Sequence, residues 1–381
     1  MQKIPGVYKQ SSQTYRTFYP NPLPPPLTLS AKAQRVVEEA THLLGQVEMC
    51  RTLLPNANLL VYSSLQREAL ASSTIEGTIT SPDALIRYQV GQHPEDEVGH
   101  EVANYSQALT WGCDQLPKRP IAYVLIVGLH EQLLHGVRGS GAIGRLKDRQ
   151  NRIGSDPREP IEAAVFIPPS PDDTVQLLGD LEQYINNQDN KEARVVQCAL
   201  VHYQFETIHP FNDGNGRVGR LLIILHMMQL GLLSAPLIYP SVYFERQRSA
   251  YYDHLQAVRD KAAWHEWIEF FAQGIVDQCH ETIAFTRTIL ALQDSLQSKA
   301  GIRKRATTTA VLNAFFNEPV LSVTAVAEQA HISYNSAQAV IAELEKGKIV
   351  RELTGKQKGR IFACDPVLDA IFNRNDAFET T

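Results

Sequence analysis

The chain contains little cysteine, and its few cysteines are not spaced as pairs. Five cysteines occur among 381 residues, at Cys50, Cys113, Cys198, Cys279 and Cys364. Because no two of them form a CxxC pair, the sequence indicates neither a zinc ribbon nor a redox dithiol. A disulfide framework is not indicated either, and this usage is typical of a reducing compartment.

An excess of positive charge and a long apolar run are both missing. Lys and Arg number 36 against 41 Asp and Glu, so the net charge is −5 and no overall affinity for nucleic acid is indicated. The longest apolar run, residues 221–233, is too short to cross a bilayer and contains His226 and Gln229. The first residues, MQKIPGVYKQ, lack the apolar core of a secretion signal. We therefore expect a cytoplasmic protein without a membrane partner.

Helical spacing dominates the chain and predicts a mainly α fold in three parts. The start, up to about residue 30, is rich in Pro and Tyr and predicts an extended arm. From Ser30 onward, apolar residues recur every three or four positions up to about residue 295. We expect an N-terminal part at 1–110, a core at 111–295 and a C-terminal domain at 301–381.

Strand-like signal is scarce, and it occurs in two places. Two short β-prone runs flank a Gly/Asp/Pro turn in residues 149–171, which predicts a small β-hairpin flap on the helical core. Beyond residue 303, the pattern predicts three helices, the second capped by Ser322 and the third following Ser333. An alternating stretch about a Gly-Lys turn follows, and this order is that of a winged helix-turn-helix.

The densest group of chemically useful residues lies in 206–226, "ETIHPFNDGNGRVGRLLIILH". Gly214-Asn215-Gly216 can bring backbone N–H groups together, and a helix begins directly after it. The free N–H groups and the dipole of a helix start favour an anion. This segment therefore predicts an anion-binding site.

The charged side chains of the same loop refine that prediction. Arg217 and Arg220 are three residues apart and project from one side of the first helical turn, which suits a ligand with more than one phosphate. Asp213 is a hard oxygen ligand that can hold Mg²⁺ beside phosphates. His209 is the group of the loop able to take a proton near neutral pH. Together they indicate a polyphosphate cradle, a metal and a base.

Two other nucleotide-binding motifs do not fit this sequence. Gly214, Gly216 and Gly219 spell GxGxxG, which in a dinucleotide fold needs a preceding strand and an acid about 20 residues later. Here a helical pattern and Pro210 precede the motif, and no acid occurs between Asp213 and Glu245. No GxxxxGK[ST] loop is present in the sequence.

Residues 209–220 resemble the signature of the Fic family, HPFx[DE]GNGRxxR, at every fixed position. Members of that family transfer a nucleotide monophosphate, most often AMP from ATP, to a protein hydroxyl. The resemblance implies that His209 deprotonates a Tyr, Thr or Ser hydroxyl, that Asp213 carries Mg²⁺, and that pyrophosphate leaves. It implies a nucleotide site made of Gly214, Asn215, Gly216, Arg217, Val218, Gly219 and Arg220.

Two further segments are similar to the same family. "GAIGRLKDRQNRIG" and "AAVFIPPSP" resemble the approach to, and the end of, its target-binding flap. The flap adds a strand of the target protein to its edge, and the resemblance implies an edge made of Ala164, Val165, Phe166 and Ile167. "ERQRSAYYDHL" resembles the helix beside the adenine pocket, with Tyr251 as the contact.

An inhibitory segment is also indicated upstream. "LASSTIEGTI" resembles the family's inhibitory motif [ST]xxxE[GN], with Ser72, Glu76 and Gly77 in place. Glu76 is expected at the end of a helix that Gly77 caps, and the resemblance implies Arg220 as its partner. An Arg220 held by Glu76 is not free for the γ-phosphate, so we expect an enzyme inhibited within its own chain. The same glutamate is alternatively able to position a water that removes AMP.

The C-terminal domain leaves a second alternative open. Residues 346–360 carry one acid, Glu352, and six bases: Lys346, Lys348, Arg351, Lys356, Lys358 and Arg360. Such a segment suits a phosphate backbone, although the expected recognition helix offers no Arg for guanine. The chain is thus either an autoinhibited protein adenylyltransferase or a nucleotide-sensing DNA-binding regulator. As a transferase, the chain is expected to modify a target protein or itself, and a homodimer is compatible with the sequence.

Overall fold

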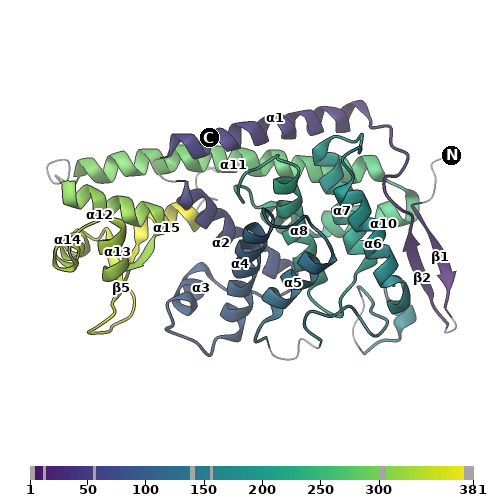
Figure 1. Cartoon of the computed structure of the whole chain (residues 1–381), viewed down its shortest axis with the longest axis horizontal. Coiled ribbons are helices and arrows are strands. Elements are labelled where there is room, and N and C mark those ends of the chain that lie inside the picture. Colours follow the sequence, from purple (N-terminus) through teal and green to yellow (C-terminus); the bar gives the residue numbers. More distant parts are fainter. Residues whose placement is uncertain are drawn as a thin grey trace.

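The computed structural model describes residues 5–11, 14–54, 57–137, 142–154, 158–299 and 306–372. Helices form most of this chain, which confirms the expected mainly α fold (Figure 1). The helices before residue 300 are α1 (Ala31–Leu53), α2 (Asn58–Ile75), α3 (Pro82–Gln89), α4 (Glu97–Gln115), α5 (Tyr123–Leu134), α6 (Thr174–Asn186), α7 (Arg194–Ile208), α8 (Asn215–Gln229), α9 (Pro240–Arg246), α10 (Arg248–Lys261) and α11 (Trp264–Lys299). Helix α4 is continuous across residue 110, so the N-terminal part and the core share one helix.

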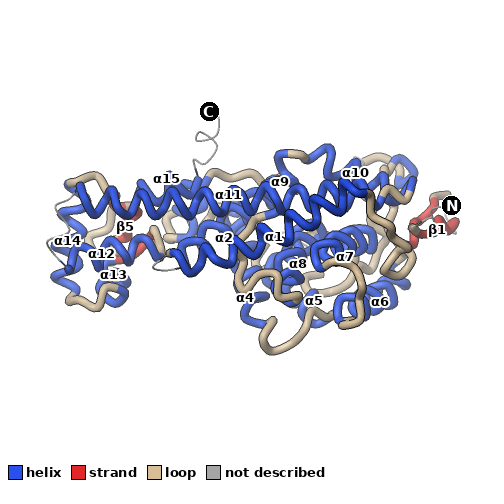
Figure 2. The backbone as a smooth tube through the Cα atoms, turned by 90° about the horizontal axis from the view of Figure 1, so that it is seen from above, coloured by secondary structure: helices blue, strands red, loops and turns tan. Residues whose placement is uncertain are grey.

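The two longest helices, α1 and α11, lie side by side along one face of the molecule (Figures 1 and 2). Ser30 begins α1 because its hydroxyl oxygen accepts the N–H of Ala33 at 3.1 Å. The buried residues Val37, Leu44 and Val47 recur at helical spacing and form the apolar face of α1. The shorter helices pack against this pair of long helices.

Helices α7 and α8 form the centre of the core. All residues from Val195 to Ile208 are buried, and most of α8 is buried as well. Both helices bury polar and charged residues as well as apolar ones, among them Glu206 of α7 and Arg220 of α8. The loop that joins them, residues 209–214, is consequently held at both ends by rigid, buried helices.

The N-terminal segment contains a hairpin that the sequence did not predict. Strands β1 (Gly6–Gln10) and β2 (Arg16–Pro20) pair antiparallel within the expected arm. Phe18 is fully buried, and the backbone N–H of Phe18 donates to Ile167 O at 3.1 Å. The hairpin is therefore fixed to the end of the segment that was expected to form the flap.

The expected flap is smaller than two paired strands. Ile153 and Phe166 form one antiparallel bridge, in which the distances from backbone N to backbone O are 2.9 and 3.2 Å. A 3₁₀ turn, Ile161–Ala163, precedes Phe166, and a second, Pro171–Asp173, leads into α6. Residues 155–157, at the expected turn, lie outside the described residues. Pro160 and the 3₁₀ turn shorten the pairing because neither continues a strand.

The C-terminal unit has the predicted elements and two more. Its elements are α12 (Ala306–Asn317), β3 (Val320–Ser322), α13 (Val323–Gln329), α14 (Tyr334–Lys346), β4 (Val350–Glu352), β5 (Ile361–Cys364) and α15 (Asp365–Phe372). Ser322 and Ser333 cap α13 and α14 as predicted, whereas β3 and α15 were not predicted. The sheet order is β3-β5-β4, so β3 adds a third strand to the predicted hairpin.

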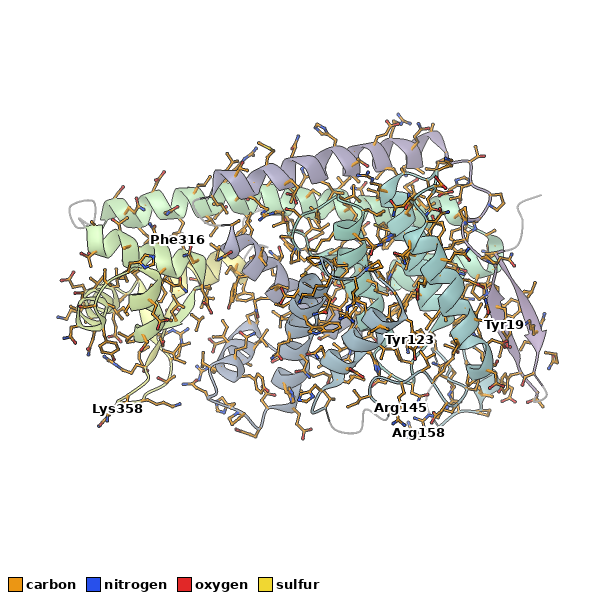
Figure 3. All side chains as sticks on the ribbon, in the orientation of Figure 1. Tyr19, Tyr123, Arg145, Arg158, Phe316 and Lys358 are labelled. Atoms are coloured by element: carbon orange, nitrogen blue, oxygen red, sulfur yellow. The ribbon has the colours of Figure 1, made fainter. Side chains whose placement is uncertain are left out.

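The C-terminal unit contacts the helix that carries the expected inhibitory motif. Helix α12 packs against α2, and Arg351 Nη2 lies 3.6 Å from Asp83 Oδ1 of α3. Lys358 projects from the loop between β4 and β5, away from the body (Figure 3). In the described residues, no helix combines the length and the apolar character needed to cross a membrane.

Replacing Trp267 with Ala tests the packing of α11 on α7. Trp267 is fully buried, and its Nε1 donates to Ala199 O at 2.9 Å. We expect the free energy of unfolding to fall by about 3–5 kcal/mol, because a large cavity remains and the hydrogen bond from the indole to Ala199 O is lost. Urea denaturation followed by circular dichroism measures this loss. Val175→Ala, at a residue 65% exposed, is the control and should change stability by less than about 0.5 kcal/mol.

Candidate active site

His209 lies where α7 ends and the loop turns toward α8. Its backbone is left-handed, with φ 50° and ψ 62°, and its N–H still donates to Phe205 O at 2.9 Å. Burial, and next the positive charges of Lys147 and Arg259, lower the pKa of His209 to about 3. The imidazole is therefore uncharged near neutral pH, which is the form that accepts a proton.

The start of α8 presents backbone N–H groups without a side-chain cap. Gly214 is the N-cap residue, with φ 76°, and no side chain accepts from the first turn. The side chain of Asn215 is already used, because it accepts from Phe211 N and donates to Phe211 O, each at 2.7 Å. Asn215 thus shapes the loop, and its contribution to an anion would be its backbone N–H.

Asp213 is the exposed carboxylate of the loop. Its side chain is 61% exposed, and its Oδ1 accepts from Gly214 N at 2.7 Å. Among the described residues, no group of three or more His, Cys, Asp and Glu is arranged to hold a metal ion. A hard cation at Asp213 would therefore need oxygens from the ligand itself, which fits Mg²⁺ bound together with phosphates.

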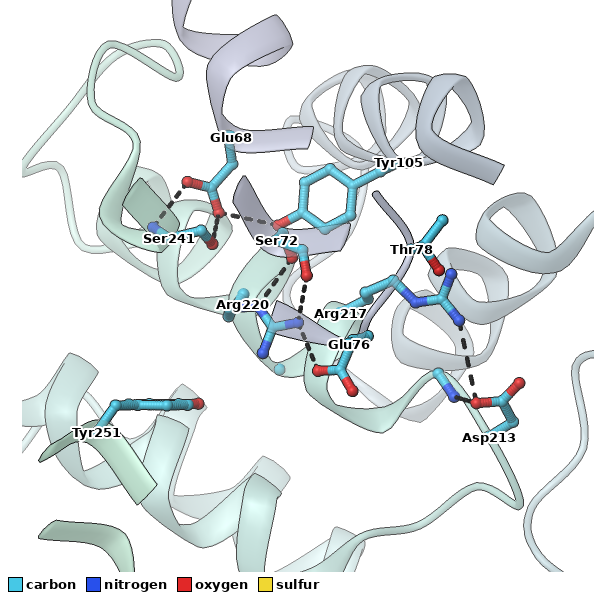
Figure 4. Close-up of polar contacts among 12 residues, drawn as sticks. Glu68, Ser72, Glu76, Thr78, Tyr105, Asp213, Arg217, Arg220, Ser241 and Tyr251 are labelled. Carbon is cyan, nitrogen blue, oxygen red and sulfur yellow. Dashed lines mark hydrogen bonds and ion pairs between the residues drawn. The ribbon is translucent and has the colours of Figure 1, made fainter. Parts of the chain in front are cut away.

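Arg217 has a partner that the sequence did not reveal. Its Nη1 forms an ion pair with Glu101 of α4, and Glu101 also accepts from Thr78 Oγ1 at 3.3 Å. The Nη2 atom of Arg217 lies 4.0 Å from Asp213 Oδ1 (Figure 4). Because Glu101 is more than a hundred positions away in the sequence, no local pattern could have identified it.

Arg220 is buried and bound to the segment that the inhibitory motif predicted. Its Nε donates to Ser72 Oγ at 2.8 Å, and its Nη2 donates to Ser72 O at 2.9 Å and to Glu76 Oε1 at 2.7 Å (Figure 4). Burial alone would lower the pKa of Arg220, but the charge of Glu76 and other anionic groups raises it above its ordinary value. The guanidinium thus remains charged and engaged.

The end of α2 fixes the position of Glu76. Helix α2 ends at Ile75, Glu76 is its C-cap, and Gly77 follows with φ 91°. The N–H of Thr78 returns to Ser73 O at 3.0 Å, which closes the helix as the sequence predicted. Gly216 faces this carboxylate, and a Cβ there would overlap Glu76 Oε1. Gly216 is therefore needed for the close approach of α8 to Glu76.

A buried carboxylate behind Ser72 anchors α2 to its neighbours. Glu68 accepts from Tyr105 Oη of α4 at 3.0 Å and from the backbone N–H of Ser241 of α9 at 3.0 Å. The Ser241 hydroxyl also donates to Glu68 (Figure 4). The sequence analysis missed Glu68, although its place one turn before Ser72 on an apolar helix was a signal.

The remaining predicted site residues differ in how deeply they are buried. Val218 and Gly219 are buried in the first turn of α8. Within the expected flap edge, Val165 is 63% exposed, whereas Phe166 and Ile167 are buried and Ala164 is partly exposed. The Phe166 ring lies under the guanidinium of Arg259, 3.8 Å from its centroid. Val165 thus provides the exposed side chain of this edge.

Tyr251 is packed in the core. Its side chain is 1% exposed, and its hydroxyl lies 2.8 Å from His202 Nε2. The ring stacks on Phe244 at a centroid distance of 4.8 Å. The next residue, Tyr252, is 39% exposed. A contact between Tyr251 and an adenine ring remains a prediction.

Comparisons with known proteins show which family models and relatives this chain matches. Residues 120–227 match the model of the Fic/DOC family, and residues 34–114 match its N-terminal model. The chain is 34% identical over 114 residues to "Protein adenylyltransferase Fic" of Aedes aegypti, which covers 27% of this chain and 21% of that protein. The protein of the same name in Culex quinquefasciatus is 38% identical over 96 residues, covering 25% and 18%. The match spans about a fifth of these relatives.

Solved structures agree with the family at the level of the fold. A Fic family protein from Desulfovibrio desulfuricans G20 is similar with a TM-score of 0.59 and 18% identity, over 90% of this chain and 98% of that chain. Fic-1 from C. elegans is similar with a TM-score of 0.52 and 18% identity, over 68% and 74%. The fold is thus that of the Fic proteins. This chain contains a Fic domain, as its signature predicted, and the match to the Fic N-terminal model, which was not predicted, precedes it.

A buried acid beside the site predicts a pH-dependent stability. Burial raises the pKa of Glu206 to about 7, more than Arg220 lowers it, and Glu206 Oε1 has no hydrogen-bond partner among the described residues. Between its ordinary value of 4.5 and about 7, the folded chain therefore keeps a proton that the unfolded chain loses. The free energy of unfolding should fall as pH rises through this window.

Glu206→Gln is expected to remove this dependence, because the amide cannot ionise. The variant should gain stability relative to the unchanged chain by up to about 1.4 kcal/mol per pH unit between the two pKa values. Urea denaturation at a series of pH values measures the difference. Glu345→Gln, at an exposed residue, is the matched control. A constant difference between Glu206→Gln and the unchanged chain at every pH would contradict the prediction.

Proposed function

We propose that this protein is an autoinhibited protein adenylyltransferase that transfers AMP from ATP to a hydroxyl of a target protein. The observation that carries the proposal is the uncharged His209 beside the uncapped N-terminus of α8, in one short loop of a Fic domain. The relatives named protein adenylyltransferase support the reaction class. A Tyr, Thr or Ser hydroxyl is the acceptor, on another protein or on the chain itself.

In the proposed reaction, His209 takes the proton of the acceptor hydroxyl. The oxygen of that hydroxyl forms a bond to the α-phosphorus of ATP, the bond from the α-phosphorus to the bridging oxygen breaks, and pyrophosphate leaves. The N–H groups at the start of α8 and the dipole of that helix stabilise the charge on the phosphates. Arg217 and Arg220 supply positive charge to the β- and γ-phosphates once they leave their present partners.

Mg²⁺ fits the exposed carboxylate of Asp213, which would hold it together with phosphate oxygens. The ion would neutralise charge on the leaving pyrophosphate. Asp213 lies directly before the α8 N-terminus, so the carboxylate and the N–H groups address the same phosphates. ATP and Mg²⁺ are therefore the proposed substrate and cofactor.

Glu76 is the proposed inhibitor. The Nε and Nη2 donors of Arg220 are engaged by Ser72 and Glu76, and Glu76 lies where Gly216 approaches α2. A γ-phosphate near Arg220 would meet this carboxylate and be repelled. Because Ser72, Glu76 and Arg220 belong to one chain, a second subunit is not required, although a homodimer can modulate the contact. The proposed location is the cytoplasm.

Glu76→Gly is expected to switch on AMP transfer. The variant frees Arg220 for the γ-phosphate, and we expect labelling with α-³²P-ATP and Mg²⁺ to rise by about tenfold or more, since each 1.4 kcal/mol of better positioning gives a factor of ten. The assay compares the unchanged chain, Glu76→Gly and Glu76→Gly/His209→Ala in a cell lysate. The double variant should be silent because it lacks the base.

Each other result of that assay has a meaning. Equal labelling by the unchanged chain and Glu76→Gly would contradict inhibition by Glu76. No labelling by any form would remove the transfer proposal and favour the alternatives. If Glu76 instead positions a water that removes AMP, the unchanged chain should release AMP from a labelled protein and Glu76→Gly should not.

The exposed loop between β4 and β5 predicts contact with a duplex as a second role. Lys356 and Lys358 are exposed, whereas Arg351 is engaged by Asp365 at 3.0 Å. Lys356→Ala combined with Arg360→Ala should weaken a mobility shift of duplex DNA at low salt and leave AMP transfer unchanged. If the unchanged chain binds no duplex at low salt, the regulator alternative is wrong.

A further inference from the structure

The segment just before the flap holds the backbone of the loop that carries His209. Four consecutive carbonyl oxygens of that loop accept hydrogen bonds from two residues, Lys147 and Asn151. The bonds are Lys147 Nζ to Ile208 O at 3.1 Å, Asn151 Nδ2 to His209 O at 3.1 Å, Lys147 N to Pro210 O at 2.9 Å and Asn151 Nδ2 to Phe211 O at 2.9 Å. Every carbonyl from Ile208 to Phe211 is thus bound.

Lys147 and Asn151, which together we call the clamp, also bind each other. Lys147 Nζ donates to Asn151 Oδ1 at 3.3 Å, which directs the amide nitrogen of Asn151 toward the loop. Lys147 is buried, with 3% of its surface exposed, and burial lowers its pKa to about 7. Burying an ammonium group costs free energy, so a buried lysine such as Lys147 indicates a structural or functional role.

The loop needs such support because of its backbone. His209 has a left-handed conformation, which costs a residue with a side chain more than it costs glycine. A residue in that region stays there only when its surroundings determine it. Without the clamp, His209 would be free to return to an ordinary conformation, and its ring would move relative to α8.

We propose that Lys147 and Asn151 are positioning residues of the transfer reaction. They fix the His209 imidazole relative to the N-terminus of α8 by binding the carbonyls around it, and the positive charge of Lys147 adds to burial in disfavouring a charged imidazole. This inference rests on the proposed function, because it assigns the clamp to the base of that reaction. Lys147 and Asn151 act through His209 and touch no reacting atom.

The charges that face His209 are of one sign. After burial, the charges of Lys147, from the segment before the flap, and Arg259, from α10, lower the pKa of its imidazole, whereas a hydrogen bond with the Glu206 backbone raises it. Arg259 is also occupied with the Phe166 ring and with Thr207 Oγ1, at 3.3 Å. Both cations disfavour a second positive charge, so removing one should make the imidazole easier to protonate.

The clamp continues directly into the flap. Gln150 Nε2 donates to Pro168 O at 2.9 Å, and Ile153 forms the bridge to Phe166. Residues 147–153 therefore tie the loop of the base to the segment that would align a target strand. A hydroxyl placed by the flap would be held in register with His209 by the same residues.

The test compares variants of the full chain in the Glu76→Gly background. Lys147→Met removes the charge and the donor at similar volume, Lys147→Arg keeps both, and Asn151→Asp keeps the shape but cannot donate to the two carbonyls. Lys191→Met, at an exposed lysine, is the matched control. The measurements are kcat and KM for ATP between about pH 3 and 9, so that the acid limb falls inside the range, with thermal unfolding at each pH to confirm that each variant is folded.

We expect Lys147→Met and Asn151→Asp to lower kcat by about tenfold or more while KM for ATP changes by less than about threefold, because ground-state binding of the nucleotide is kept. The acid limb of the rate profile should move to higher pH in both variants, and Lys147→Arg should restore it. An equal loss at every pH, with no movement of the limb and no rescue by Arg, would overturn the inference.

A second readout does not depend on transfer. Titration of the His209 ring by NMR, assigned by comparison with His209→Ala, should give a higher pKa in Lys147→Met than in the unchanged chain. An unchanged ring pKa would contradict the proposal even if transfer occurs. If Glu76→Gly transfers no AMP, the proposed function fails, and the ring titration still decides whether Lys147 controls the base.

Discussion

The buried guanidinium of Arg220 is the constraint around which the site is organised. Its side chain is 1% exposed, so its N–H donors must be satisfied by protein atoms when no ligand is present. Ser72 and Glu76 satisfy them from the end of α2, and Gly216 permits the close approach. In the proposed function, a ligand phosphate and Glu76 would compete for the same donors. Breaking a buried ion pair without a replacement is costly, so the proposed inhibition needs only this one contact.

That ion pair depends in turn on how α2 is held. Glu68 connects α2 to α4 and α9 within the core, and α12 of the C-terminal unit packs on the same helix. Glu76 sits at the end of α2, where Gly77 turns the chain away. A rigid helix with a fixed end can place a carboxylate more reproducibly than a loop can. The inhibitory contact is thus a property of helix packing as much as of charge.

The surroundings of His209 meet a different requirement. As the proposed base, His209 must be uncharged, accessible to a proton and fixed in its strained backbone conformation. Burial and two nearby cations favour the uncharged imidazole, and hydrogen bonds from Lys147 and Asn151 hold the backbone. The same short segment then becomes the flap. The loop of His209 and the flap segment are consequently held by one continuous piece of chain, which in the proposed function would align a target hydroxyl with the base.

The helical fold, the end of α2 at Gly77 and most elements of the C-terminal unit could be predicted from the sequence, whereas β3 and α15 could not. The predicted features follow from local spacing and capping, which a short stretch of chain encodes completely. Other features could not be read from the sequence: the pairing of Glu101 with Arg217, the anchoring of α2 by Glu68, the burial of Tyr251 and, among the described residues of the flap, the pairing of Ile153 with Phe166. Each of these depends on which distant helices meet, and burial and hydrogen-bond partners arise only from that packing.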